Sequence, residues 1–308
     1  MTGKVNNYLE VDVVHIYMLS NDKGVIFYEK DDFLIFFTIV CCCARKYGIS
    51  VVAFCIMLNH IHLAVLRTNI DSIKLFMYEV KTSYAREYNT QYSRKGALWQ
   101  KSFGRSIVYD RKNKQTLAAY IYNNPVQKCI CSKANEYRWN FLKYYNDKYP
   151  FSSFIPHDHA SSNYRNALKI LTYRMERIQP LNYALLKNLY KKLSDLESNT
   201  FKDCIISQYN CIDYAFFLSL YNDFNQMNKA FEYTVGKQYE INEYKGPASY
   251  IEFRILYQET KRLGYVGKAR PFFKMTQSEL IQLSNILQKS TKASQYHLNH
   301  YLHIGLEE

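Results

Sequence analysis

Two histidines separated by one residue are the first feature of this sequence that could carry out chemistry. His60 and His62 lie in residues 58–65, where the pattern is typical of a short strand. Side chains along a strand point alternately to its two faces, so both imidazoles point one way while Ile61 and Leu63 point into the core. Two imidazoles can hold one divalent metal ion, but a third ligand has to come from another part of the chain.

A second pair with the same spacing shows that spacing alone is not specific. His157 and His159 lie in residues 150–163, which are rich in Ser and Pro and show no apolar alternation. Such a composition is typical of a loop, so we interpret this stretch as a linker. The first pair therefore needs support from elsewhere in the chain.

That support comes from a helix predicted at Asn113–Asn124, with Asn113 as its N-cap and Pro125 as its end. Tyr120 and Asn124 are four residues apart, so they share one face of this helix. Asn124 could supply an amide oxygen as the third metal ligand. Tyr120 would then bring a phenol oxygen within one helical turn of the metal site.

The elements around these residues predict an α+β fold. We expect strands at residues 11–19, 49–57, 61–67 and 104–109, and helices at residues 31–47 and 72–88. A strand, a helix, two strands, a helix and a strand in this order form a ferredoxin-like antiparallel sheet backed by two helices. The helix that carries Tyr120 would follow the fourth strand.

The charge balance favours an anionic partner. The chain has a formal net charge of +13, and residues 1–150 hold 21 of its 40 Lys and Arg but only 12 of its 27 Asp and Glu. Its 30 Tyr and 18 Phe could stack on the bases of single-stranded nucleic acid, although a bias of composition towards Tyr, Asn and Lys explains them equally well.

Basic residues between positions 71 and 114 are the candidate phosphate contacts. Arg105 is the first choice, because it would lie near the site on the fourth strand. A solvated helix face is an equally good interpretation of any single lysine. The further candidates are Lys101, Arg111, Lys112, Arg86 and Lys81. Trp99 could stack on a base, but core packing is the simpler expectation for it.

The cysteines and the hydropathy pattern indicate a cytoplasmic protein. None of the eight cysteines forms a C-x-x-C pair, and Cys41, Cys42 and Cys43 lie in an apolar, helix-like segment, as expected of reduced core residues. No signal peptide is evident, and no apolar run reaches the length of a membrane span.

Five short motifs, in one order, resemble the REP-associated tyrosine transposases, which belong to the HUH single-strand DNA transposases. Residues 59–63 match the HUH motif, in which two histidines flank a bulky apolar residue. The other motifs match the family's second helix, its Gly-x-Leu-Trp-Gln-x-x-Phe segment, its catalytic helix and the Glu-Tyr-x-Trp segment after it, at residues 83–89, 96–103, 120–126 and 136–139. The resemblance covers residues 10–145.

The resemblance implies an HUH fold for residues 1–149 and roles for four residues. His60, His62 and Asn124 would bind Mg²⁺ or Mn²⁺, and Tyr120 would be the nucleophile that forms a 5′-phosphotyrosine bond. The family also implies strand transfer on single-stranded DNA with a REP-like hairpin, a homodimer, and a place with the nucleoid in the bacterial cytoplasm. The glycine that usually follows the Asn-Pro-Val of this family is missing here, which affects a turn more than the chemistry.

The second half of the chain is expected to be all-α. Residues 164–308 follow the linker at 150–163, and residues 276–303 have the pattern of a helix-turn-helix opened by a capping box. A plain helical hairpin fits residues 276–303 nearly as well. Three histidines near its end could bind a metal, but a solvated or DNA-facing edge is the favoured expectation for them: His297, His300 and His303.

Two other functions fit the same sequence. A domesticated DNA-binding protein could keep the fold and lose catalysis, although the intact set of His60, His62, Tyr120 and Asn124 argues against decay. An HUH replication or mobilisation initiator would use the same chemistry. Such initiators more often carry two catalytic tyrosines or additional domains.

Overall fold

A four-stranded antiparallel sheet forms the centre of the first half of the chain. The computed structural model describes residues 10–234, 250–266 and 271–305. The strands are β1 Val13–Leu19, β2 Val51–Ile56, β3 His60–Leu66 and β4 Gly104–Val108, in the order β2-β3-β1-β4. This order, with the expected succession of elements, confirms the predicted α+β class and the ferredoxin-like sheet.

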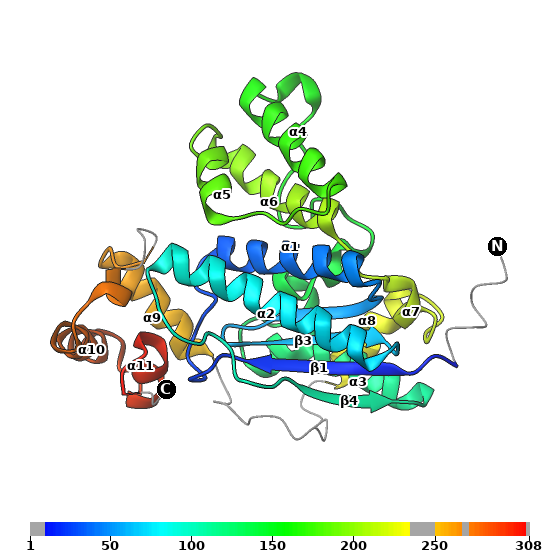
Figure 1. The fold of residues 1–308 in the computed structure, drawn as a ribbon, viewed down its shortest axis with the longest axis horizontal. Coiled ribbons are helices and arrows are strands. Elements are labelled where there is room, and N and C mark those ends of the chain that lie inside the picture. Colours follow the sequence, from blue (N-terminus) through cyan, green and yellow to red (C-terminus); the bar gives the residue numbers. More distant parts are fainter. Residues whose placement is uncertain (1–9, 235–249, 267–270, 306–308) are drawn as a thin grey trace.

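Helices α1 Lys30–Tyr47 and α2 Ile70–Tyr92 cover one face of this sheet (Figure 1). Phe54 on β2 points to this face and packs against Phe36 and Phe37 of α1, with ring centroids 6.2 and 6.1 Å apart. Trp99 packs there too, 5.5 Å from Phe36, which confirms its predicted place in the core.

Helix α3, Arg111–Gln127, begins earlier and ends later than predicted. Asp110, and not Asn113, is its N-cap, because the Asp110 carboxylate accepts hydrogen bonds from the backbone N–H and the side-chain amide of Asn113. The prediction that Pro125 ends the helix is also wrong. Pro125 has no N–H to donate, but the helical hydrogen bonds resume after it, since Lys128 N–H donates to Asn124 C=O at 3.0 Å.

The rest of the described chain is helical, which confirms the predicted all-α second half. Four short 3₁₀ turns follow α3, at Ala134–Glu136, Arg138–Asn140, Leu142–Tyr145 and His157–His159. The helices are α4 Ser162–Glu176, α5 Tyr183–Tyr190, α6 Asp195–Tyr209, α7 Tyr214–Leu218, α8 Phe224–Thr234, α9 Ile251–Arg262, α10 Gln277–Thr291 and α11 Gln295–Leu302, with a 3₁₀ turn at Pro271–Lys274. None of the helices that the structure describes is long and apolar enough to cross a membrane.

The helical half packs directly on the first half (Figure 1). Buried Asp32 on α1 accepts hydrogen bonds from Tyr92 of α2 and Tyr183 of α5, at 2.7 and 2.8 Å. Asp213, just before α7, donates its backbone N–H to Val51 C=O on β2. The division into residues 1–149, 150–163 and 164–308 stays a prediction, and these contacts join the two halves through one continuous core.

Helices α9, α10 and α11 pack together near the C-terminal end of the described chain. Thr276 and Glu279 form the predicted capping box of α10. The expectation of a solvated histidine edge is wrong for two of the three histidines: His297 is buried and bonds to Ser294, and His303 bonds to Asp22 and to Val25 C=O. Whether α10 and α11 read DNA as a helix-turn-helix stays a prediction.

Candidate active site

The two histidines of β3 share one face of the sheet, as predicted. Their ring centroids lie 5.0 Å apart, whereas Ile61 and Leu63 are fully buried on the other face. Strand β1 pairs Tyr17 with His62, so β1 adds Tyr17 and its neighbour His15 to the histidine face. His15 is fully buried beside His62.

Each histidine has a partner at its Nδ1 atom. His60 Nδ1 lies 2.8 Å from Asn59 Oδ1, and His62 Nδ1 lies 3.2 Å from His15 Nε2. We assign the Nδ1–H tautomer to both rings, because Asn59 Oδ1 can only accept and because His62 Nε2 faces an amide N–H. Both Nε2 lone pairs are then directed towards α3.

Burial keeps both imidazoles in the form that a metal ion requires. Together with the positive charge of Lys128, burial lowers the pKa of His60 well below its usual range and that of His62 to about 3. The two rings are therefore neutral at physiological pH. A neutral imidazole with its second nitrogen hydrogen-bonded is the usual state of a histidine metal ligand.

Asn124 of α3 stands opposite these nitrogens. Its Nδ2 lies 3.1 Å from His62 Nε2, and its buried Oδ1 has no hydrogen-bond partner among the described residues. A half-turn of the amide would bring Oδ1 towards His62 Nε2 in place of Nδ2. No group of three or more His, Cys, Asp or Glu side chains in the described ranges could hold a metal, so a metal here needs the amide. The three side chains fit a divalent ion.

Tyr120 lies one turn before Asn124 and completes the group. Its half-buried ring meets those of His62 and His15 edge to face, at centroid distances of 5.3 and 6.0 Å. Tyr122 occupies a different environment, because it is fully buried and stacks on Phe231 of α8. Burial raises the pKa of Tyr122, so the structure offers Tyr120 as the accessible phenol.

The structure thus brings together the four predicted site residues and adds others that sequence reasoning missed. These are His15, Tyr17, Asn59 and Tyr250. A histidine and a tyrosine inside the apolar first strand were a signal that could have been used, because both share its polar face. No local pattern pointed to Tyr250, which is 190 residues away from His60 in the chain.

The candidate DNA contacts are more dispersed than predicted. Arg105 pairs with Ile16, so it points to the sheet face opposite the histidines, and the expectation that it lies at the site is wrong. Lys81 Nζ is bound to the carbonyls of Gln100 and Lys101, at 2.6 and 2.8 Å.

The other basic candidates differ in their contacts and exposure. Arg111 donates to Leu220 C=O at 2.7 Å, which ties the start of α3 to the segment after α7. Arg86 of α2, Lys101 before β4 and Lys112 at the start of α3 are exposed. A role in binding DNA stays a prediction for all six basic residues.

Comparison with known proteins shows what part of this chain is similar to. Residues 12–124 match the family model described as "Transposase IS200 like", an interval that begins just before β1 and ends at Asn124. The predicted resemblance is confirmed. We refer to residues 12–124 as the transposase-like domain.

Two further comparisons cover parts of the chain. A curated protein of Haemophilus influenzae, with the provisional name of REP-associated tyrosine transposase, is 28% identical in an alignment of 113 residues that covers 33% of this chain and 63% of that protein. A solved structure of the REP-associated tyrosine transposase bound to a REP hairpin aligns at a TM-score of 0.36 and 15% identity, over 42% of this chain and 75% of that one.

Proposed function

We propose that this protein cleaves and rejoins single-stranded DNA through a covalent bond to Tyr120. The observation that carries the proposal is that two side chains of α3 contact His62 of β3. The ring of Tyr120 lies 5.3 Å from the ring of His62, and the amide of Asn124 lies 3.1 Å from His62 Nε2. A half-exposed phenol beside two neutral imidazoles and an amide supplies the groups that a metal-dependent tyrosine nuclease needs.

The roles of these residues follow from their chemistry. A divalent ion held by His60, His62 and Asn124 would act as a Lewis acid on the scissile phosphate. Tyr120 Oη would attack phosphorus and form a 5′-phosphotyrosine ester as the P–O3′ bond breaks. The phenol proton passes to solvent, and the departing 3′ oxygen takes up a proton to become a 3′-hydroxyl.

The tyrosine ester keeps the reaction reversible. A phenol has a reference pKa of about 10, well below that of an alkyl hydroxyl, so Tyr120 is a good leaving group. A 3′-hydroxyl from another strand end can attack the ester and restore a phosphodiester bond. Strand transfer therefore needs no nucleotide cofactor.

We take the substrate to be single-stranded DNA with a REP-like hairpin. The five motifs and the name of the Haemophilus relative support this choice. The solved relative is described as bound to a REP hairpin. A homodimer is part of the proposal, because one nucleophile per protomer lets two protomers hold two strand ends. The donor set of two nitrogens and one oxygen suits Mn²⁺ better than Mg²⁺, which prefers oxygen ligands.

The test is a covalent adduct assay. End-labelled hairpin DNA from the protein's own genomic flanks is incubated with Mn²⁺ or Mg²⁺ and the wild type, Tyr120→Phe or Tyr122→Phe, and then run on a denaturing gel. We expect an adduct with the wild type and with Tyr122→Phe, and none with Tyr120→Phe. Binding of the DNA without an adduct under either metal would contradict the enzyme and leave the non-catalytic DNA-binding protein.

A further inference from the structure

Tyr250 connects the helical half of the chain to the histidine face. It lies directly before α9 and is almost fully buried. Its hydroxyl donates to Asn59 Oδ1 at 2.8 Å, and its backbone N–H donates to Lys128 C=O at 2.7 Å. One residue is therefore bonded both to the start of the histidine strand and to the end of the helix that carries Tyr120.

Asn59 links Tyr250 to His60 through hydrogen bonds. Its Oδ1 accepts from the Tyr250 hydroxyl and from His60 Nδ1, while its Nδ2 donates to Lys23 C=O at 2.6 Å. Since both ends of the buried amide are engaged, its orientation is fixed. An acceptor held at Nδ1 keeps the proton there and leaves the Nε2 lone pair of His60 for a metal. The ring of Tyr250 also covers His60 edge to face, with centroids 6.4 Å apart.

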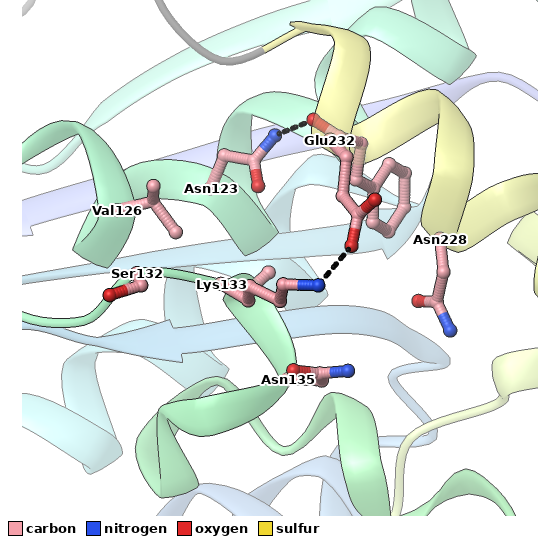
Figure 2. A pocket seen from close by; sticks show the side chains of 9 residues that line it. Asn123, Val126, Ser132, Lys133, Asn135, Asn228 and Glu232 are labelled. Atoms are coloured by element: carbon pink, nitrogen blue, oxygen red, sulfur yellow. Dashed lines mark hydrogen bonds and ion pairs between the residues drawn. The ribbon is translucent and has the colours of Figure 1, made fainter.

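Helix α8 packs against the helix that carries Asn124. Asn123, next to Asn124, donates its side-chain amide to Phe231 C=O at 2.7 Å (Figure 2). Lys133, after α3, forms an ion pair with Glu232 of α8 at 3.2 Å, also visible in Figure 2. The helical half thus contacts both elements that supply the candidate metal ligands.

We propose that Tyr250 is a positioning residue of the active site, which through Asn59 fixes the orientation and tautomer of His60 for a divalent metal ion. The inference rests on the metal site of the proposed function. It gives the helical half a part in catalysis that is separate from any contact with DNA. The effect should appear first in metal affinity, because Tyr250 touches neither the ion nor the nucleophile.

The experiment compares the full-length wild type with Tyr250→Phe, which removes only the hydroxyl. Tyr257→Phe is the matched control, because Tyr257 lies two turns further along and its hydroxyl bonds to Glu29, away from the site. Binding of Mn²⁺ is measured without DNA, from the loss of the electron paramagnetic resonance signal of the free ion. We expect Tyr250→Phe to weaken Mn²⁺ binding roughly tenfold, as loss of an outer-shell partner usually does, and the control to bind like the wild type.

A double-mutant cycle tests the route through Asn59. In Asn59→Ala, which removes the linking oxygen, Tyr250→Phe should cause a much smaller further loss of Mn²⁺ affinity, because only the 3.4 Å approach of the Tyr250 hydroxyl to His60 Nδ1 is left. Asn59→Leu removes the same oxygen with less change of volume and serves if the alanine variant does not fold. Equal losses from Tyr250→Phe in both backgrounds would overturn this route.

Adduct formation separates this inference from the proposed function. Under the inference, Tyr250→Phe loses adduct at limiting Mn²⁺ and recovers it at saturating Mn²⁺. Unchanged Mn²⁺ affinity in Tyr250→Phe, or faster cleavage, would overturn the positioning role. If Tyr250→Phe weakens Mn²⁺ binding as expected while no protein, including the wild type, forms an adduct, the positioning role stands and the proposed nuclease does not.

Discussion

The ring of Tyr17 lies flat against the backbone of Gly104. A Cβ atom built on Gly104 would stand 1.9 Å from Tyr17 Cζ and 2.2 and 2.3 Å from the Cε1 and hydroxyl oxygen beside it, so it would enter the ring almost along its normal. Tyr17 pairs with Gly104 on one side of β1 and with His62 on the other. The absence of a side chain at the start of β4 therefore lets an aromatic ring lie next to the candidate metal site.

Gly104→Ala should destabilise the protein by displacing this ring. Overpacking of a well-ordered site costs about 1–3 kcal/mol, so we expect a lower free energy of unfolding by that amount in urea denaturation. Tyr17→Ala removes the obstacle, and the double variant should be no less stable than Tyr17→Ala alone. Additive losses in the double variant would mean that the close approach of Tyr17 does not set the cost.

Asn124→Leu should weaken metal binding strongly and leave the fold intact. Leucine matches the size of the asparagine side chain but offers no ligand atom. Loss of a direct ligand should weaken Mn²⁺ binding by at least the roughly 10- to 100-fold seen for outer-shell partners. Asn123→Leu is the matched control, because its amide bonds to Phe231 of α8 and not to the histidines. Equal Mn²⁺ affinities in the two variants would remove Asn124 from the ligand set.

The contact between Asp22 and His303 predicts a pH dependence of stability. Burial alone would raise the pKa of Asp22, but the hydrogen bond and the charge of His303 and the N–H of Gly24 lower it to about 2. A carboxyl group whose folded pKa lies below its unfolded value of 3.8 stabilises the fold above that value, and this stability is lost as the pH falls towards 2.

Asp22→Asn should therefore cost about 2 kcal/mol at pH 7 and progressively less below pH 4. Unfolding in urea at pH 7, 5, 4 and 3 measures the difference from the wild type. The same cost at all four values would show that the ion pair with His303 is not its source.

Binding of DNA should depend on exposed Lys112 more than on Lys81. Lys112 is exposed at the start of the Tyr120 helix, whereas Lys81 is bound to two carbonyls. If Lys112 contacts one phosphate, Lys112→Ala should lower the slope of log affinity against log salt concentration by about one. Lys81→Ala should leave that slope unchanged and lower the melting temperature instead. Fluorescence anisotropy over a range of salt concentrations gives the slopes.

The sequence predicted that the four candidate residues lie together because two local periodicities determine their positions. Alternation along a strand places His60 and His62 on one face, and the helical repeat places Tyr120 next to Asn124. The order of the strands then follows from a known arrangement of elements. These are short-range rules, and they hold here.

The errors come from relationships that are not local. The face of Arg105 depends on its register with β1, where it pairs with Ile16, and no pattern within β4 reveals that register. The place of Tyr250 depends on how a distant helix packs on the histidine strand. Pro125 lies inside its helix because the next N–H groups still find acceptors, which the proline rule alone does not foresee.

The central claim is that Tyr120 forms the covalent bond to DNA, and mass spectrometry tests it most directly. Trypsin should release residues 115–128 as one peptide, since Lys114 and Lys128 bound it and no Lys or Arg lies between them. After reaction with hairpin DNA and Mn²⁺ and nuclease digestion, fragment ions show which tyrosine carries the nucleotide. We predict a 5′-linked nucleotide on Tyr120 and unmodified Tyr122. A nucleotide on Tyr122 or on any other residue would contradict the account.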